Sequence, residues 1–450
     1  MIIEIRLFLR LIPMFFLLLF VFNCNTKATK KHLTCMIFVA ARNDLKSYAP
    51  YNLKQMEAIG SNENLTIIVQ HHTSDKSNKL ISKTIRVEKN KQIIEEEFFN
   101  VDSGSADALI NFCNYAITHY PAKHYALILW NHGIGALEPL ENACLKHSNF
   151  SFSKLYGYQN DYNLNIPEKA IYIPFLKNIL LQNHTSKKAV CFDDETKSFL
   201  SENKLRTALD VITKKTLKGK KIDIIGFDAC LMAMIEVAAF IEEYADIMIA
   251  SQNVELGPGW NYTKILSPFL IWPISPESFS KHIVNVYAQT YEHMSDFTQS
   301  ALLLSVTPEI LRNISNVADL LIKGLKQQKN NSVLLTIKKS RNHHSCTHFD
   351  EPSFIDLHHF YNNLLMNLPY IEISKNQQNA FVNELQRALI SGIKSINNMV
   401  LENKTGQTLT NAKGVSIYFP EHTIYPSYLY THFAKNSSWK SFLIEYLARQ

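Results

Sequence analysis

Residues 222–230 read IDIIGFDAC, an apolar run that ends in a polar turn carrying Cys230. Residues 124–133 read HYALILWNHG and repeat the arrangement, with His132 in the turn. Short, continuous apolar runs of this kind are typical of strands buried on both faces of a parallel sheet. In open parallel sheets, functional groups gather beyond the carboxyl ends of the strands. The two segments therefore predict a parallel sheet that presents His132 and Cys230 at one edge.

The sequence around these segments alternates apolar strands with amphipathic stretches. Predicted strands cover residues 33–40, 64–70, 81–88, 124–130, 222–227 and 247–251, and predicted helices cover 43–59, 106–120, 204–215 and 231–244. Parallel strands separated by helices of this length are joined by right-handed crossovers. The predicted fold class is α/β, with a mostly parallel sheet flanked by helices in a domain spanning about residues 34–295.

Two parts of the chain depart from this alternation. Residues 135–190 are rich in Asn, Lys, Tyr and Pro and predict an irregular insertion, a kind of segment that is usually functional or mobile. After residue 296, predicted helices at 307–326, 376–401 and 439–448 and a strand at 414–420 indicate a C-terminal α+β extension or subdomain covering 296–450.

The first 26 residues predict an export signal. Arg6 and Arg10 precede an uncharged run over residues 11–26, which is too short for a typical membrane span. Cys24 follows the apolar residues and resembles the lipidated cysteine of a bacterial lipoprotein signal, although Asn23 stands where that signal prefers a small residue. We expect an exported protein, and three outcomes stay open: a cell-envelope lipoprotein attached to a membrane through Cys24, a freely secreted protein, and an uncleaved anchor.

The composition argues against a nucleic-acid-binding protein and against a disulfide scaffold. Lys plus Arg number 46 against 40 Asp plus Glu, and the basic residues are scattered, so no nucleic-acid partner is expected. The seven cysteines in 450 residues form no CxxC pair, which argues against a disulfide scaffold. Stability must come mainly from the hydrophobic core.

His132 and Cys230 together predict nucleophilic catalysis, although each alone also fits a structural role. A helix beginning at Leu231 would place Cys230 at its N-terminus, where free N–H groups and the macrodipole favour the thiolate. His132 at a neighbouring strand end would supply the base. Gly133 permits close approach of a substrate, and the amides of Gly133 and Cys230 would form an oxyanion hole.

The motifs NHG at 131–133 and DACLM at 228–232 resemble the His and Cys motifs of the clostripain family, which is related to the caspases. The resemblance extends over about residues 34–445, through MIFVAARNDL at 36–45, CFDD at 191–194, SQNVELGPGW at 251–260 and GVSIYFP at 414–420. It implies a caspase-like cysteine endopeptidase that cleaves protein or peptide substrates after Arg or Lys at P1, through a Cys–His dyad and with no required cofactor.

The resemblance also implies a P1 pocket and a maturation step. Asp228 matches an acidic position that helps bind a basic P1 side chain, although a turn or helix-cap role fits it equally well, and Glu255 is retained from the same pattern. Gln252 and Pro258 stand where the family commonly has acids, which puts the P1 preference in doubt. Family members often mature by self-cleavage between the two motifs, and Lys146 is the first choice among the lysines of the insertion.

Two clusters raise the question of metal ions. His343, His344, Cys346 and His348 are zinc-ligand types, but no second cluster at finger-like spacing accompanies them, so we predict no metal site there. Asp193, Asp194 and Glu195 are ligand types for calcium, the one ion that the sequence allows as an optional cofactor. The alternative function is a catalytically inactive, surface-binding lipoprotein on the same fold, and the retention of His132 and Cys230 favours the enzyme.

Overall fold

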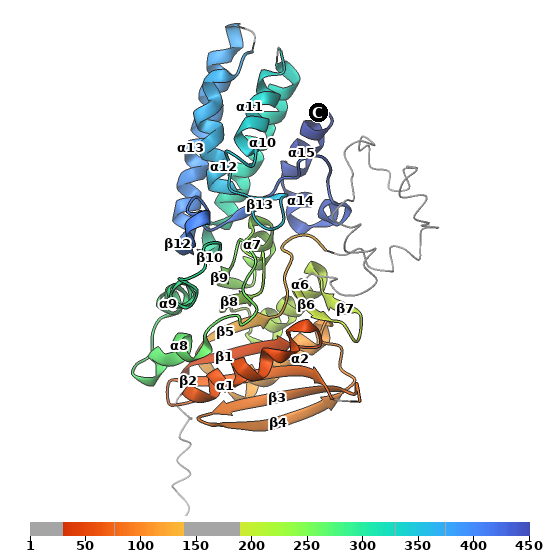
Figure 1. Ribbon diagram of the computed structural model, residues 1–450, viewed down its shortest axis with the longest axis vertical. Helices are drawn as coiled ribbons and strands as arrows, with labels where there is room; N and C mark the ends of the chain where they lie inside the picture. The colour runs from red at the N-terminus through yellow and green to blue at the C-terminus, as the bar shows by residue number, and fades with distance from the viewer. Residues whose placement is uncertain (1–29, 76, 139–189, 329, 374) are drawn as a thin grey trace, which may run out of the picture.

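The computed structural model describes residues 30–75, 77–138, 190–328, 330–373 and 375–450. A nine-stranded sheet lies at its centre, in the order β12-β10-β9-β8-β5-β1-β2-β3-β4 (Figure 1). The five middle strands run parallel and two antiparallel strands extend each edge. This confirms the predicted α/β class. The strands are β1 (Lys31–Ala40), β2 (Leu65–Ser74), β3 (Leu80–Glu88), β4 (Lys91–Phe99), β5 (Ala122–Trp130), β8 (Ile222–Asp228), β9 (Ala245–Ala250), β10 (Thr298–Leu303) and β12 (Val400–Thr405).

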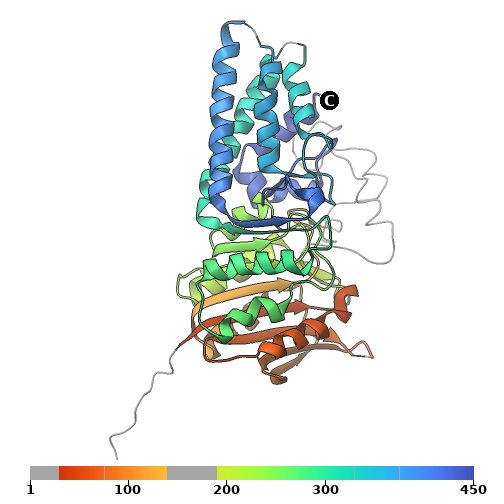
Figure 2. The same cartoon turned by 60° about the vertical axis from the view of Figure 1, so that its left-hand side comes forward.

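Helices cover both faces of the sheet, which explains why its middle strands are apolar throughout. In β1, Ile37 contacts the layer of α1, α8 and α9, whereas Phe38 contacts the opposite layer of α2, α6 and α7. Figure 2 shows α8 and α9 lying over one face. These helices are α1 (Ala49–Ile59), α2 (Ala106–His119), α6 (Glu202–Val211), α7 (Ile235–Ile241), α8 (Tyr262–Leu266) and α9 (Pro276–Thr290).

The C-terminal residues continue this architecture. They form α10 (Thr307–Gln327), α11 (Ser332–Arg341), α12 (Leu357–Asn367), α13 (Lys375–Met399), α14 (His432–Asn436) and α15 (Trp439–Leu447). Most of these helices stand beyond the β12 edge of the sheet (Figure 1). A two-stranded sheet of β11 (Phe354–Asp356) and β13 (Ser416–Tyr418) lies among them. Because β9 and β10 are paired, the boundary predicted at residues 295–296 falls between neighbouring strands of one sheet.

Short elements complete the fold. A hairpin of β6 (Val190–Asp193) and β7 (Ser198–Leu200) follows the insertion. The 3₁₀ turns are η1 (Asp44–Ser47), η4 (Ser267–Leu270), η5 (Leu304–Val306), η6 (Leu368–Tyr370), η7 (Gln407–Leu409) and η8 (Pro426–Tyr430), and η3 (Ile212–Thr216) is a π-helical turn. Cys24, Lys146 and most of the insertion lie outside the described residues.

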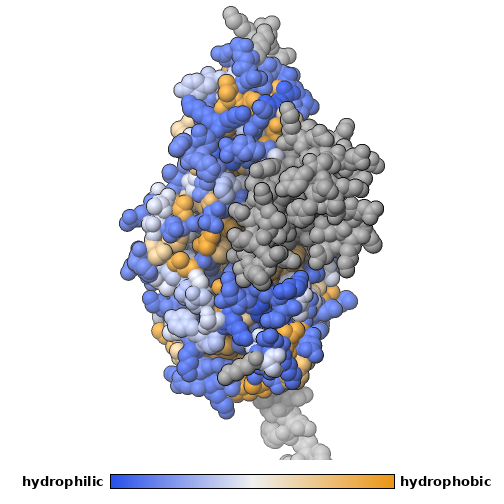
Figure 3. All heavy atoms as spheres, turned by 45° about the vertical axis from the view of Figure 1, so that its right-hand side comes forward, coloured by the Kyte–Doolittle hydropathy of each residue, from blue (hydrophilic) through white to orange (hydrophobic). Residues whose placement is uncertain are grey.

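Two expected helices differ from the prediction, and three strands were not predicted. The helix expected at 43–59 is divided into η1 and α1, and the helix expected at 231–244 is confined to α7. Strands β4, β10 and β12 were not predicted. β4 and β12 are the edge strands of the sheet, and polar residues such as those in KQIIEEEFF at 91–99 weaken the apolar pattern, while β10 is a short inner strand that begins with the polar residues TQS. No helix in the described part of the chain is both long and apolar enough to cross a bilayer. Figure 3 shows a mainly hydrophilic surface with scattered hydrophobic residues.

Candidate active site

The turns that carry His132 and Cys230 lie side by side at the carboxyl edge of the sheet. Strands β5 and β8 are parallel neighbours, and their last paired residues are Trp130 and Asp228. His132 and Cys230 each come two residues later. A Cβ atom added to Gly133 would lie 2.3 Å from the carbonyl oxygen of Cys230, so the two turns are in contact and only glycine fits there. The structure therefore brings together the two residues predicted from their strand ends.

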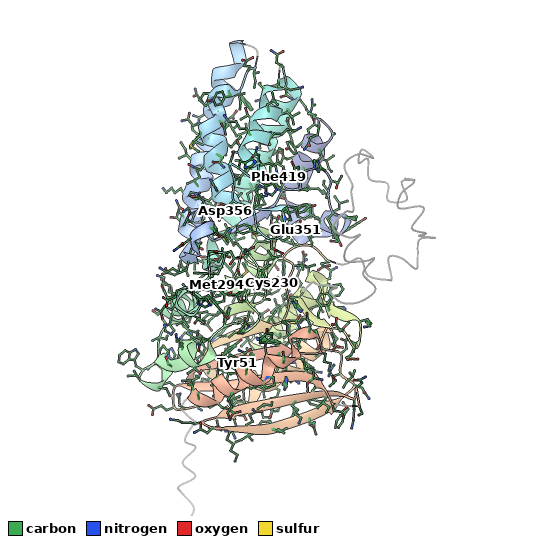
Figure 4. All side chains as sticks on the ribbon, in the orientation of Figure 1. Tyr51, Cys230, Met294, Glu351, Asp356 and Phe419 are labelled. Atoms are coloured by element: carbon green, nitrogen blue, oxygen red, sulfur yellow. The ribbon has the colours of Figure 1, made fainter. Side chains whose placement is uncertain are left out.

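Cys230 is the accessible thiol among the five described cysteines. Cys35, Cys113, Cys191 and Cys346 are buried, and burial raises the pKa of each of these thiols above its ordinary value. Cys230 is only partly buried. Figure 4 shows it near the middle of the molecule, where the sheet meets the C-terminal helices. A nucleophilic thiol must be accessible to its substrate, and Cys230 meets this requirement among the described cysteines.

The backbone N–H of Glu255 donates to the Sγ atom of Cys230 over 3.3 Å. The distance from Sγ to the carbonyl oxygen of Glu255 is 3.8 Å, within reach of the thiol proton. A backbone N–H aimed at sulfur stabilises a thiolate, since hydrogen bonds to a charged acceptor are stronger than those to a neutral one. The loop that contains Glu255 therefore supports the charged form of the thiol.

The prediction that Cys230 opens a helix is wrong. Leu231 has a positive φ of 63°, which ends any helical path directly after the cysteine. The following residues bond to other segments: the N–H of Leu231 donates to the carbonyl of Asn253, and that of Ala233 donates to the carbonyl of Ser251. Helix α7 begins only at Ile235 and has seven residues. Support for the thiolate must therefore come from the Glu255 amide rather than from a helix terminus.

His132 contacts Asp44, a residue that the sequence analysis did not single out. The Nε2 atom of His132 lies 2.5 Å from Oδ1 of Asp44, whose side chain is 65% exposed. Asp44 begins η1, which follows β1 after three residues, and β1 is the neighbour of β5 in the sheet. The motif MIFVAARNDL at 36–45 contained the available signal, a carboxylate beyond the carboxyl end of a buried strand.

Asn131, the residue before His132, ties the turn to the hairpin that follows the insertion. Its Oδ1 accepts the N–H of His132 at 2.6 Å and the N–H of Phe192 at 2.9 Å. Its Nδ2 donates to the carbonyl of Phe192 at 3.2 Å and to that of Ala40. Asn43 donates to the same Phe192 carbonyl at 3.0 Å. The orientation of the histidine turn therefore depends on β6 being in place.

A buried ion pair anchors the same hairpin. The Arg42 guanidinium donates to Asp193 Oδ2 at 2.8 Å, and both side chains are fully buried. Asp193 also accepts from the hydroxyl of Ser103 at 2.8 Å and from the N–H of Thr196 at 3.1 Å. Its oxygens are therefore already satisfied by the protein. The calcium prediction at residues 193–195 counted Asp193 as a ligand, whereas the structure places it in this ion pair.

The profile that describes the clostripain family matches residues 37–168 and 177–446, which is most of the chain. The chain belongs to the clostripain family of cysteine peptidases. It is 23% identical to clostripain of Hathewaya histolytica over 269 residues, an alignment that covers 54% of this chain and only 43% of the relative.

Solved structures of low sequence identity share the fold of this clostripain-family chain. A secreted C11 cysteine protease from Bacteroides thetaiotaomicron, in complex with an irreversible peptide inhibitor, has a TM-score of 0.57 at 18% identity. An inactive zymogen of a C11 protease from Parabacteroides distasonis has a TM-score of 0.56 at 18% identity. In both comparisons 91% of this chain and 99% of the other chain are covered. Both support the caspase-like sheet architecture.

Asp228 and Glu255, the predicted substrate-binding residues of this clostripain-family member, form a buried carboxyl pair beside Cys230. Asp228 accepts from the hydroxyl of Tyr262 at 2.8 Å and from the N–H of Trp260 at 3.2 Å. Burial raises the pKa of Asp228 to about 6. Burial, and then the charge of Asp228, raise the pKa of Glu255 well above its ordinary value. Burial therefore disfavours a doubly charged pair at this position.

Gln252 and Pro258, where family members commonly have acids, have different surroundings. Gln252 is buried and bonds Asp356 at 2.9 Å and the N–H of Gly414 at 2.8 Å, so it links the site loop to the C-terminal region. Pro258 is exposed, and its carbonyl accepts from Asn52 at 3.0 Å. Gly259 follows with a positive φ of 66° against the Asp228 carboxylate. The loop therefore lies directly over Asp228.

The histidine cluster near residue 343 is held by protein contacts. The rings of His343 and His348 stack with centroids 3.7 Å apart, and both nitrogens of His348 lie within 2.8 Å of backbone carbonyls of Pro352 and Arg341. Within the described ranges, no group of three His, Cys, Asp or Glu side chains is arranged to hold a metal ion. This cluster has a structural explanation.

Proposed function

We propose that this protein is an active cysteine endopeptidase in which Cys230 is the nucleophile and His132 is the proton carrier. The observation that supports this most strongly is the contact between the two turns at the carboxyl edge of β5 and β8. The alternative of an inactive binding lipoprotein gives no reason for an accessible thiol to lie beside a histidine whose orientation is fixed by Asn131 and Asp44.

The proposed reaction uses the groups already described. The Cys230 thiolate attacks the carbonyl carbon of the scissile bond, and the developing oxyanion accepts hydrogen bonds from the amides of Gly133 and Cys230. His132 protonates the leaving amine as the C–N bond breaks, which leaves a thioester on Cys230. Water then attacks the thioester while His132 takes up its proton, and the thiolate is released. With Nε2 held by Asp44, Nδ1 is the nitrogen that exchanges these protons.

We propose Arg or Lys as the preferred P1 residue. The support is the carboxyl pair of Asp228 and Glu255, which lies next to the nucleophile and in which burial raises both pKa values. A cationic P1 side chain near the pair would favour ionisation of the second carboxyl group. Because Pro258 adds no charge, we expect moderate rather than strict selection.

Maturation and localisation are also proposals. Self-cleavage between the motifs, with Lys146 as the first candidate, would leave the β6–β7 hairpin bound through Arg42 and Asn131. The signal at residues 1–26 and Cys24 support export and lipid attachment, and the Bacteroides thetaiotaomicron structure is described as that of a secreted protease. The enzyme should need no cofactor, and calcium stays an optional one.

The test compares cleavage of fluorogenic peptides with Arg, Lys or a neutral residue at P1 by the full chain, by Cys230→Ala and by His132→Ala. Loss of cleavage in both variants, with unchanged melting temperatures, is the expected result. Activity should persist after chelation with EGTA. A chain that cleaves no peptide, and whose Cys230 does not react with a thiol-directed peptide probe before or after nicking of the insertion, would instead fit the binding lipoprotein.

A further inference from the structure

Three consecutive apolar side chains project from the end of η4 and the loop that leads to α9. Leu270, Ile271 and Trp272 are 49%, 69% and 61% exposed, and Ile271 is the most exposed large hydrophobic residue in the described part of the chain. Such a group is costly in water unless something covers it. We call these residues the apolar tip.

The apolar tip is presented by a well-fixed turn. The carbonyl of Pro268 accepts the N–H of Ile271 at 3.0 Å and that of Trp272 at 3.2 Å. Phe269, directly before the tip, is 1% exposed and packs edge-to-face on Phe279 of α9. The exposure of the tip is therefore imposed by the fold.

The tip lies at the point where the chain enters the sheet from its N-terminal segment. His32 of β1 contacts the carbonyl of Ile274 through Nε2 at 2.8 Å, and its ring lies 6.4 Å from that of Phe269. Asn64, just before β2, donates to the carbonyl of Phe269 at 3.3 Å. Cys24 is seven residues before Lys31, so the connecting chain spans at most about 25 Å.

The same edge of the sheet carries several exposed lysines. The amino ends of β1, β5 and β8 adjoin one another because these neighbouring strands are parallel. The exposed lysines at or before these ends are Lys30, Lys123, Lys218, Lys220 and Lys221. Their acidic neighbours include Asp223, which bonds to His124, Glu242, which lies 3.7 Å from Lys221, and Asp246 of β9, which interacts with Lys221. Tryptophan favours the membrane interface, and lysine favours anionic headgroups.

We propose that the apolar tip inserts into the surface of a lipid bilayer beside the lipidated N-terminus; this rests on the proposed attachment through Cys24. The ten-residue strand β1 spans about 30 Å, so its carboxyl end holds the active site at that distance from the bilayer. Figure 1 shows α8, which precedes the tip, at the opposite end of the strands from the β6–β7 hairpin. The site then opens toward the surrounding medium, away from the lipid.

Tryptophan fluorescence can test this selectively. The chain has four tryptophans, and Trp130, Trp260 and Trp439 are at most 2% exposed, so Trp272 is the one that a bilayer can reach. The full chain, produced in a bacterium that exports and lipidates it, is reconstituted in vesicles with or without brominated acyl chains, which quench nearby tryptophans. We expect quenching in the wild type and none in Trp272→Phe.

A matched control moves the reporter to a distant exposed site. In Trp272→Phe/Tyr370→Trp, the tryptophan occupies a position that is 63% exposed among the C-terminal helices, and it should not be quenched. Equal quenching in this variant and the wild type would overturn the proposal, as would a wild type that floats with vesicles without being quenched. Failure to float would refute the lipid attachment and the proposal with it. Peptide cleavage by the same vesicles tests the proposed enzyme separately.

Discussion

Asp44 contacts His132, the proposed proton carrier, from a largely exposed position, which limits what Asp44 can contribute to the rate. An exposed ion pair contributes up to about 1 kcal/mol, equivalent to roughly fivefold in rate. We expect Asp44→Ala to lower kcat two- to fivefold with little change in KM, because Asp44 orients His132 without forming part of a substrate pocket. Steady-state kinetics on an Arg peptide would measure this. Asp319→Asn, an exposed change on α10, is the control, and a rise in KM alone would contradict the positioning role.

Pro258 offers a gain-of-function change in the proposed P1 pocket. It is exposed, and its contact to Asn52 uses the backbone carbonyl, which any residue provides. Pro258→Asp would add a negative charge on the loop over Asp228. We expect the ratio of kcat/KM for Lys over neutral P1 peptides to rise about tenfold, equivalent to about 1.4 kcal/mol. Pro258→Asn controls for loss of the ring, and an unchanged ratio in the aspartate variant would show that this loop does not face P1.

The β6–β7 hairpin is held by the ion pair of Arg42 and Asp193, and it contacts the turn that carries His132 through Asn131. Removing one member of a buried pair leaves an uncompensated charge and costs about 3–5 kcal/mol. We expect Arg42→Met to lower the melting temperature by several degrees and to reduce activity, because Asn131 loses its partner strand when the hairpin loosens. Differential scanning fluorimetry and peptide cleavage would measure the two effects.

The double variant Arg42→Met/Asp193→Leu separates the effect of an unpaired buried charge from the effect of changed packing. It should melt above Arg42→Met, since no charge remains buried without a partner. Lys281→Met, which removes an exposed ion pair with Glu277, should change the melting temperature very little. If the hairpin is dispensable for peptide cleavage, all three variants will cleave peptides at the wild-type rate, which would contradict the prediction.

At the scale of elements, apolar runs made some strands predictable. Strands β1, β5 and β8 are buried on both faces and read as continuous apolar segments, so their ends located His132 and Cys230. Strand β12 reads VLENKT and has no buried face, and it becomes a strand by pairing with β10, a long-range contact that local sequence does not encode. Asp44, Asn131 and Arg42 were missed because their roles depend on β1 lying next to β5 and on β6 crossing their ends.

Over the whole molecule, one hydrophobic core joins the sheet to the C-terminal helices. Its buried residues run from Met36 in β1 to Leu447 in α15. Two polar contacts cross the same junction: Gln252 bonds Asp356 and Gly414, and Glu236 of α7 accepts the N–H of Tyr418 in β13 at 2.9 Å. The C-terminal region therefore supports both the loop over Asp228 and the helix that follows Cys230.

Glu236 makes this junction sensitive to pH. It is buried, it also accepts from the Tyr428 hydroxyl at 3.1 Å, and burial raises its pKa from 4.5 to about 7. A carboxyl group whose pKa is raised on folding contributes stability below its unfolded pKa and loses it as pH rises through the folded pKa. Glu236→Gln keeps an oxygen for Tyr418 and does not titrate. The melting temperature of the variant minus that of the wild type should therefore increase between pH 5 and pH 8.5.

The matched control is Glu277→Gln, which changes an exposed carboxylate at the start of α9. Its difference from the wild type should stay constant over the same pH range, since this side chain is largely exposed in the folded protein. Other buried groups titrate in this interval, but they contribute equally to the variant and the wild type and cancel in the difference. A pH-independent difference for Glu236→Gln would mean that the folded protein keeps this carboxylate ionised, and that the junction is held by packing alone.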